Sequence, residues 1–248
     1  MKYHRLFAFA GALLILACWE MACRAFEIPD FILPMPTQII SVALFKATLL
    51  IPHAGATALE VVLGILISLA IAVPLSMVMF ANPAVENAIA PFLVASQAVP
   101  VFAIAPLLVV WLGYGISSKV LMAAIIIFFP ITVNLLEGFK SCDQEYRILF
   151  QLMGAGFWKT MRLLFWKWAL PHFFAGLKVG VSVATIGAVI GEWVGAQQGL
   201  GYLMIQANAR LRVDLVFAAI LWLSAMGVIL WLFVGFLEKR IIAWKHLS

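Results

Sequence analysis

Residues 55–80 read GATALEVVLGILISLAIAVPLSMVMF, an almost uninterrupted apolar stretch with one charged side chain, Glu60. A helix needs about 20 consecutive apolar residues to cross the roughly 30 Å hydrocarbon core of a bilayer, so this stretch is long enough to span a membrane. It also lacks the alternation of apolar and polar residues that is typical of a membrane β-strand. The stretch therefore predicts a membrane-spanning helix.

Similar apolar runs recur along the whole chain. Six are visible, at about 6–24, 55–80, 86–112, 119–137, 173–194 and 214–237. Hydrophobic residues make up 65% of the chain and charged residues only 11%, whereas about a quarter of the residues of soluble domains are charged. We expect an all-α polytopic membrane protein with about six transmembrane helices, organised as a single domain over residues 1–248.

The N-terminus fits two interpretations. Lys2, His4 and Arg5 followed by an apolar run from Leu6 are compatible with a cleavable signal peptide, and the stretch ending at Cys18 is compatible with a lipoprotein site. Because several long apolar runs follow, we interpret this segment as a first transmembrane helix that is not cleaved.

The distribution of Lys and Arg predicts the orientation, because these residues favour the cytoplasmic side of short membrane loops. With the N-terminus inside, the inner segments hold clearly more of them than the outer segments. The inner set is Lys2, Arg5, Lys140, Arg147, Lys159, Arg162, Lys167, Lys239, Arg240 and Lys245, and the outer set is Arg24, Lys46, Lys119, Arg210 and Arg212. Both termini are therefore expected in the cytoplasm, with Lys178 embedded in the membrane.

The connections carry further signals. Residues 28–46 contain three prolines and then read as a short amphipathic helix at the outer interface, with Thr37 as its N-cap. A glycine- and serine-rich turn at 112–118 predicts that the third and fourth runs form a tight antiparallel pair. Four prolines within these two runs predict kinks: Pro91, Pro100, Pro106 and Pro130.

The cytoplasmic segment 138–172 is the connection of greatest functional interest. At helical spacing its apolar residues fall on one side: Leu149, Met153, Phe157, Met161, Leu164, Phe165 and Trp168. Gly154 and Gly156 interrupt the pattern, so we expect two short helices with a bend. The pattern fits an amphipathic pair resting on the membrane and equally a docking element for a cytoplasmic partner.

Ionisable residues within the spans need a specific reason, because burying one in the bilayer costs about 2.5–3.5 kcal/mol on insertion scales. Glu20, Glu137 and Lys178 lie close enough to a helix end to snorkel. Glu60 and Glu192 remain, and a salt bridge, a hydrogen bond within the bundle or an aqueous vestibule would each satisfy them. The candidate residues for a translocation path are Glu60, Gln97, Asn134, Thr185 and Glu192, with Ser96 and Ser182 as further polar residues within the runs.

The sequence contains no recognisable catalytic or metal-binding pattern. The four histidines are far apart, and the three cysteines, Cys18, Cys23 and Cys142, have neither disulfide nor zinc spacing. Residues 154–160 are glycine-rich and end in Lys-Thr but lack the glycine before the lysine that a phosphate loop requires. We therefore expect no catalytic residue, no metal and no cofactor on this chain. The net charge of +5 is spread over loops, which argues against nucleic acid.

Several motifs in the sequence have a familiar form. They are ALPHFFAGLK at 169–178, GAVIGEW at 187–193, GLGY at 199–202, LPMP at 33–36, and the proline-containing run at 99–107. These motifs resemble the permease subunits of bacterial binding-protein-dependent ABC importers, in the branch that handles nitrate, sulfonates, taurine and pyrimidine thiamin precursors. The resemblance covers nearly the whole chain and implies a type I importer permease in the bacterial inner membrane.

In that family a cytoplasmic loop carries a Glu-Ala-Ala motif, followed three residues later by glycine, and docks on the ATPase as a coupling helix. Gly154 matches this glycine, but Ile148-Leu149-Phe150 occupy the Glu-Ala-Ala positions, and Trp166-Lys167 stand where many members have an earlier Leu-Pro. The resemblance assigns the coupling segment to Leu149, Phe150, Met153, Gly154, Ala155, Phe157, Trp158, Met161 and Pro171. The departures imply a docking surface of larger apolar side chains and a specialised ATPase.

The resemblance also implies the partners: a second copy of the permease, two ATPase subunits that bind the ATP, an external substrate-binding protein and membrane lipid. The substrate stays open among nitrate-like anions, small sulfonates and pyrimidines, and the resemblance favours a pyrimidine thiamin precursor. An ion-coupled secondary transporter using Glu60 and Glu192 is the alternative, although the inverted repeat it predicts is not visible. A membrane enzyme would need a cluster of reactive side chains, which the sequence lacks.

Overall fold

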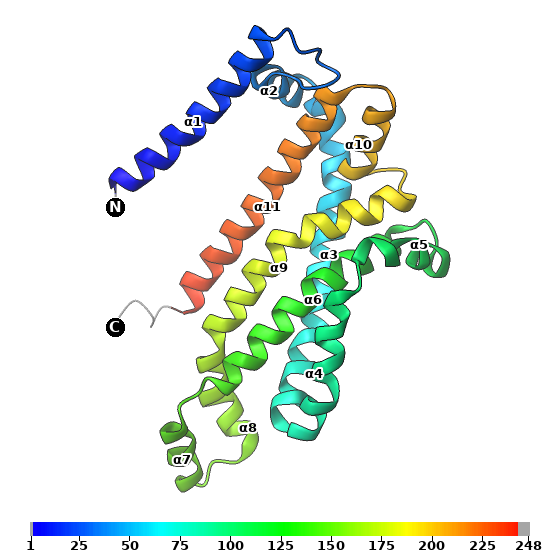
Figure 1. Cartoon of the computed structure of the whole chain (residues 1–248). Coiled ribbons are helices and arrows are strands. Elements are labelled where there is room, and N and C mark those ends of the chain that lie inside the picture. Colours follow the sequence, from blue (N-terminus) through cyan, green and yellow to red (C-terminus); the bar gives the residue numbers. More distant parts are fainter. Residues whose placement is uncertain (1, 243–248) are drawn as a thin grey trace. The chain divides into compact units, whose positions relative to one another are not determined.

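The computed structural model describes residues 2–242, and every regular element within that range is a helix (Figure 1). In chain order the helices are α1 (Lys2–Ala25), α2 (Pro36–Phe45), α3 (Ala47–Ala81), α4 (Pro83–Ala98), α5 (Val101–Leu112), α6 (Ile116–Lys140), α7 (Gln144–Leu152), α8 (Phe157–Thr160), the π-helix η1 (Met161–Phe165), α9 (Trp166–Gly195), α10 (Leu200–Ala209) and α11 (Val213–Ile241). The side chains of residues 2–6, 8 and 9 and all of residues 243–248 lie outside the description, and with them Lys2, Arg5 and Lys245 of the orientation argument.

The chain forms two compact units. The first contains the residues up to Thr57 together with Gln197–Ala225, and the second contains Ala58–Ala196 together with the residues from Met226 onward. The single domain expected from the sequence stays a prediction.

Four helical segments are long and apolar enough to cross a membrane: Ala47–Ala81, Ile116–Lys140, Phe157–Gly195 and Val213–Ile241. They confirm the predicted runs at 55–80, 119–137, 173–194 and 214–237, each extended by several residues. The predicted first span, 6–24, coincides with α1, and its crossing of the membrane stays a prediction.

The third predicted span, 86–112, is wrong as a single helix. The chain breaks at Val99-Pro100 into α4 and α5, whose axes differ by 100°. Pro100 has no N–H to donate and disfavours the helical conformation of the residue before it, and Val99 is accordingly extended. Pro91 and Pro106 stay inside their helices. The predicted kink is thus a full break at Pro100, and of the two halves it is α5 that the turn at 113–115 joins to α6.

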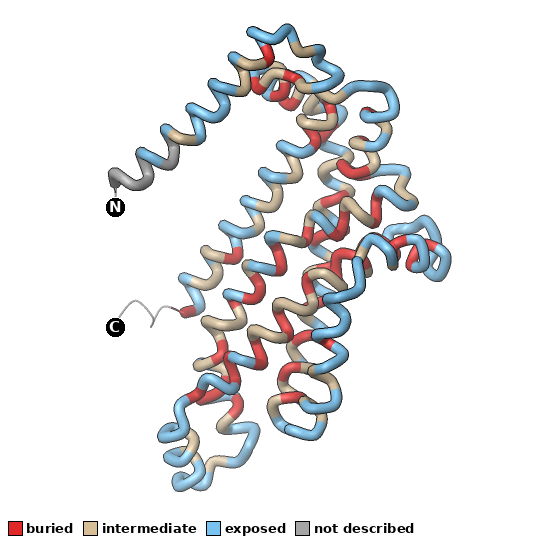
Figure 2. Tube along the Cα trace, viewed as in Figure 1, coloured by how far each residue is buried: buried red, intermediate tan, exposed pale blue. Residues whose placement is uncertain are grey.

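A seam of small residues lets α9 lie very close to α6 in the second unit. A Cβ atom on Gly176 would lie 2.6 Å from the carbonyl oxygen of Pro130, and one on Gly187 would lie 2.8 Å from Cα of Ala123. The seam consists of Gly176, Gly180, Ala184, Gly187, Ala188 and Gly191, all buried (Figure 2). Small residues three or four positions apart are the usual means by which membrane helices approach closely. The sequence analysis overlooked this spacing.

The segment 138–172, predicted to be cytoplasmic, folds partly as expected. It contains the two short helices α7 and α8 with a turn between them, but α8 continues through η1 into α9. The single apolar stripe is wrong, because the turn ends the helical periodicity. Met161 and Phe165 are buried, whereas Met153 is 72% exposed.

In the first unit, Glu20 of α1 holds the start of α2. Its carboxylate accepts hydrogen bonds from the backbone N–H and the hydroxyl group of Thr37, at 3.1 and 2.8 Å, and pairs with Arg24 at 2.7 Å. The N-cap position belongs to Met35, with Pro36 as the first helical residue, so the predicted N-cap at Thr37 is wrong. Glu20 thus satisfies a helix N-terminus, and its position relative to the membrane surface stays a prediction.

The GLGY motif of the first unit begins α10 and is anchored by α3. Nδ1 of His53 accepts a hydrogen bond from the N–H of Gly199 at 3.1 Å, and the hydroxyl of Thr57 accepts one from the N–H of Leu200 at 2.9 Å. Two N–H groups at the start of a helix are thereby satisfied. Gly199 has φ +120°, a conformation that favours glycine, which explains the residue type at this position.

Candidate functional site

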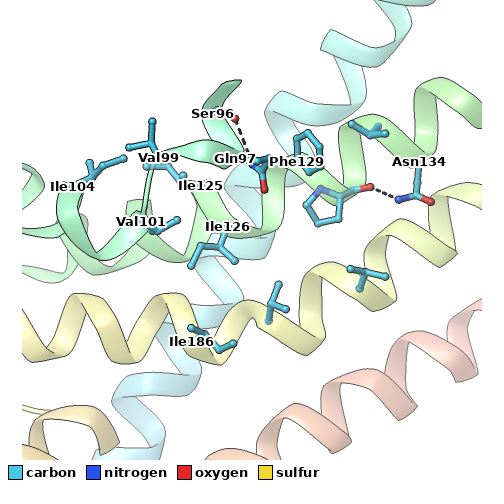
Figure 3. A pocket seen from close by; sticks show the side chains of 14 residues that line it. Ser96, Gln97, Val99, Val101, Ile104, Ile125, Ile126, Phe129, Asn134 and Ile186 are labelled. Carbon is cyan, nitrogen blue, oxygen red and sulfur yellow. Dashed lines mark hydrogen bonds between the residues drawn. The ribbon is translucent and has the colours of Figure 1, made fainter. Parts of the chain in front are cut away.

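A cavity of ≈ 520 Å³ lies in the second unit, bounded by α4, α5, α6 and α9 at the break in the third predicted span. Its walls are mainly valine and isoleucine side chains, with Phe129 among them. Three polar side chains enter it: Ser96 and Gln97 from α4 and Asn134 from α6 (Figure 3). An apolar cavity with a few convergent polar groups is the usual form of a small-molecule site.

The polar side chains keep hydrogen-bonding capacity for a solute. Nδ2 of Asn134 donates to the carbonyl oxygen of Pro130 at 2.8 Å, and Nε2 of Gln97 donates to Oγ of Ser96 at 3.4 Å (Figure 3). Each bond uses one amide hydrogen, so each amide still offers a carbonyl oxygen and a second hydrogen. The cavity therefore presents both donors and acceptors.

The predicted path residues divide into two groups. Gln97 and Asn134 line the cavity together. Thr185 is half-buried on α9 and lies outside the described residues that line it, as do Glu60 and Glu192.

Glu60 and Glu192 meet instead in a buried cluster with Lys119. Glu60 on α3 is 4% exposed, Lys119 on α6 is 4% exposed and Glu192 on α9 is 1% exposed. The two carboxyl groups share a side-chain hydrogen bond, and both interact electrostatically with the ammonium group. Of the explanations left open from the sequence, a hydrogen bond within the bundle applies, and the positive charge of Lys119 acts on both carboxyl groups.

Lys119 fastens the beginning of α6 to the end of α9. Its Nζ donates to the carbonyl oxygens of Tyr114, Gly115 and Gly195, at 2.7, 2.8 and 3.2 Å. These bonds use all three ammonium hydrogens, and the Gly195 carbonyl belongs to the last turn of α9, where no intrahelical donor remains. Lys119, counted from the sequence with the outer segments, lies in the first turn of α6 and not in a loop, and its side of the membrane stays a prediction.

The cluster balances its charge if the carboxyl pair holds one proton. A hydrogen bond between two carboxyl groups needs a proton, because a carboxylate only accepts. One proton on the pair leaves one negative charge, which compensates the positive charge of Lys119. Such balance matters because an uncompensated buried charge is strongly destabilising.

Lys178 forms an ion pair with a residue of another helix. Its ammonium group forms an ion pair with Glu238 of α11 and lies 5.5 Å from the ring centroid of Trp231. Glu238 was not singled out from the sequence, because it directly follows the apolar run 214–237 and stands beside Lys239 and Arg240.

The α7–α8 turn lies at one end of the α6–α9 pair (Figure 1) and presents an apolar surface there. Its exposed side chains are Leu149, Leu152, Met153, Phe157 and Trp158. Met161 is buried and Phe150 packs against the same buried cluster, so these two predicted coupling residues support the surface without forming it. Ala155 and Pro171 are half-buried, the latter inside α9.

Gly154 shapes this surface. Its N–H donates to the carbonyl of Gln151 at 2.9 Å, the N–H of Ala155 donates to that of Phe150 at 3.0 Å, and Gly154 has φ +67°. These two bonds and the left-handed glycine form a Schellman motif, which ends α7. The glycine predicted from the resemblance therefore has a defined structural task.

The spans and the broken helix pair define a polytopic helical membrane protein, with a cavity between its helices. The chain belongs to the family described as the binding-protein-dependent transport system inner membrane component, which it matches over residues 61–243. It is thus the translocation subunit of an ABC importer, a multi-pass protein of the inner membrane. Such permeases work in general with an ATPase and a substrate-binding protein.

Named relatives support this assignment. The chain is 40% identical to a probable ABC transporter permease protein of Haemophilus influenzae, over 92% of this chain and 93% of the relative. It is 39% identical to a formylaminopyrimidine transport permease protein of Halalkalibacterium halodurans, over 94% and 93%. It is 28% identical to a taurine transport system permease protein of Escherichia coli, over 94% and 87%. The resemblance inferred from the motifs is confirmed, and it sets aside the ion-coupled alternative.

Proposed function

We propose that this permease carries a pyrimidine precursor of thiamin, and that the solute passes through the cavity between α4, α5, α6 and α9. The observation that carries this proposal is that two amide side chains, Gln97 and Asn134, line the same cavity, whose other walls are apolar. An amide pairs its donor and acceptor with the ring nitrogens and amino groups of a pyrimidine, while the apolar walls accept the ring faces.

The charge of the cavity argues against an anion. Nitrate, sulfonates and taurine carry a negative group, which a binding site usually meets with Arg, Lys or several N–H donors. The described residues that line the cavity include no Lys or Arg. The identity to the formylaminopyrimidine permease also exceeds that to the taurine permease.

The partners and orientation belong to the same proposal. A second copy of this chain completes the path, a cytoplasmic ATPase binds the ATP and docks on α7 and α8, and an external binding protein delivers the solute. The exposed apolar residues Met153 and Trp158 fit a protein partner, since a membrane would leave their polar neighbours unsolvated. The basic residues Lys159, Arg162 and Lys167 near this surface support a cytoplasmic location with both termini inside.

The proposed mechanism uses these parts in sequence. ATP closes the ATPase dimer, which draws the two α7–α8 surfaces of the permease pair together. The permease converts this movement into an outward opening and receives the solute from the binding protein. This chain supplies the path and the leverage, and the ATPase supplies hydrolysis.

The test is uptake by the purified complex. The permease is co-expressed with its ATPase and its substrate-binding protein, reconstituted into liposomes, and supplied with labelled formylaminopyrimidine or labelled taurine. We expect ATP-dependent uptake of the pyrimidine, and we expect Gln97→Met to reduce it because the variant keeps the length of the side chain and removes the amide. Thr185→Val, outside the cavity, is the control. Uptake of taurine in place of the pyrimidine would refute the substrate, and a permease that transports without an ATPase would refute the partner.

A further inference from the structure

Arg147, near the start of α7, contacts parts of three other helical segments. Its Nη2 donates to the carbonyl oxygens of Phe139 and Lys140, at 3.3 and 2.7 Å. These two carbonyls belong to the last turn of α6, where no intrahelical N–H remains to satisfy them. A cation at a helix C-terminus is also favoured by the helix dipole. Arg147 therefore acts as a cap for α6 supplied by α7.

The same guanidinium group lies against two aromatic rings. Its central carbon is 5.8 Å from the ring centroid of Phe80, at the end of α3, and 5.3 Å from that of Phe165, the last residue of η1. The two rings are themselves in edge contact, with centroids 4.8 Å apart. Arginine stacks on aromatic faces at such distances by cation–π attraction.

The π-helix gives this contact added meaning. η1 joins α8 to α9, and π-helical turns are rare segments that frequently mark functional sites. A π-helical turn holds one residue more than an α-helical turn, so η1 offsets the register of α8 from that of α9. Arg147 touches this turn at Phe165, on the side that also faces α3.

We propose that Arg147 is a positioning residue for transport: it transmits a displacement of α7 to the ends of α3 and α6 and to η1. The inference rests on the proposed docking of the ATPase on α7 and α8. Arg147 is half-buried behind the exposed face of α7, so it takes part in transmission and not in docking. Its planar fork makes two carbonyl bonds and two ring contacts at once, which the ammonium group of lysine does not reproduce.

The experiment compares Arg147→Met with Arg162→Met in the reconstituted complex with its ATPase and binding protein. Both variants replace arginine with an unbranched apolar side chain within the same cytoplasmic segment, but Arg162 is exposed on η1. Three quantities are measured: the ATPase that co-purifies, ATP hydrolysis with and without loaded binding protein, and uptake.

We expect Arg147→Met to keep ATPase co-purification and basal hydrolysis within about twofold of wild type, as for a change outside the docking face. Uptake should fall by about tenfold or more, and so should the stimulation of ATP hydrolysis by loaded binding protein. This is the range of coupling between distant sites. Arg162→Met should behave as wild type. Arg147→Lys, which keeps the charge but not the fork, should retain assembly and lose part of the uptake.

Wild-type uptake in Arg147→Met would overturn the inference. It would also be overturned if uptake fell only in proportion to a fall in the amount of co-purifying ATPase. If Arg147→Met does not accumulate in the membrane, Arg147→Lys decides, and full uptake in that variant refutes the role of the fork. A wild-type permease that purifies without any ATPase would instead refute the proposed function.

Discussion

Glu60 of α3 and Glu192 of α9 share a hydrogen bond between their carboxyl groups, inside a cluster that also buries Lys119. Lys119 donates to three backbone carbonyls, and the carboxyl pair supplies the negative charge that balances its ammonium group. The cluster ties α3, α6 and α9 together through side chains that the cavity does not use.

This arrangement predicts that the protein tolerates replacement of one of the two carboxyl groups by an amide but is destabilised when both are replaced. Glu192→Gln keeps a donor, an acceptor and the balance of charge, so it should cost less than about 1 kcal/mol, as for a hydrogen bond retained. Glu60→Gln combined with Glu192→Gln leaves Lys119 uncompensated and should cost about 3–5 kcal/mol, as when one partner of a buried ion pair is removed. Thermal unfolding of the three purified proteins measures the difference.

A double variant as stable as the single variant would show that the charge of Lys119 is compensated elsewhere. Uptake by Glu192→Gln separates structure from transport. Wild-type uptake across the pH range would leave the cluster a structural role, whereas a changed pH profile would assign it to the translocation path.

The close approach of α6 and α9 predicts that replacing a glycine with alanine destabilises the protein within the seam and stabilises it elsewhere. Gly187→Ala places a methyl group 2.8 Å from a backbone atom of Ala123, so the helices must separate, and we expect a loss of about 1–3 kcal/mol as for an overpacked core. Gly227→Ala on α11 meets open space and should stabilise the helix by about 0.5–1 kcal/mol. If the unfolding temperatures of the two variants shift in the same direction, the seam is not tightly packed.

In the α7–α8 turn, replacing a glycine with alanine should change stability through the backbone conformation alone, without a steric clash. A Cβ atom meets nothing within 4 Å at Gly154 or at Gly156, but only Gly154 has positive φ. Gly154→Ala should therefore cost about 1–2 kcal/mol, the penalty of the left-handed conformation, and weaken association with the ATPase. Gly156→Ala, where φ is −67°, should leave it unchanged. Equal co-purification of the ATPase with both variants would contradict this assignment.

The sequence predicted the long spans because each is a continuous apolar run, and such runs have few alternatives in a membrane. It did not predict which proline breaks the third run. Pro91, Pro100 and Pro106 look alike in sequence, yet α4 and α5 accommodate two of them, and only the tertiary structure selects Pro100. The stripe across 149–168 failed for a similar reason, since periodicity does not continue through the Schellman turn.

The candidate site was predicted in part. Gln97 and Asn134 were identified as polar residues within apolar runs, and they line one cavity. Glu60 and Glu192 were identified by the same rule but belong to another cluster, because hydrophobicity indicates that a charge is buried and not what it faces. Arg147 was counted only as a loop charge, since its contacts with α3, α6 and η1 depend on how the chain folds back.

The loop after α6 supplies the last prediction, which concerns the reactivity of Cys142. Burial raises the pKa of its thiol, and a hydrogen bond from Arg147 offsets only part of that effect. The thiolate is the reactive form, so a raised pKa leaves less of it near neutral pH. In a protein with Cys18→Ser and Cys23→Ser, Cys142 should react slowly with a water-soluble maleimide, and its rate should rise at higher pH than that of an ordinary thiol. Ser141→Cys combined with Cys142→Ser is the matched control, because Ser141 is exposed and adjacent.

Equal labelling rates of Cys142 and of the control cysteine at every pH would mean that the loop does not bury Cys142, and hence that α7 is not held against α6 by Arg147. Slow labelling of Cys142 that accelerates in Arg147→Met, despite the loss of the positive charge that favours the thiolate, would mean that Arg147 keeps the loop closed.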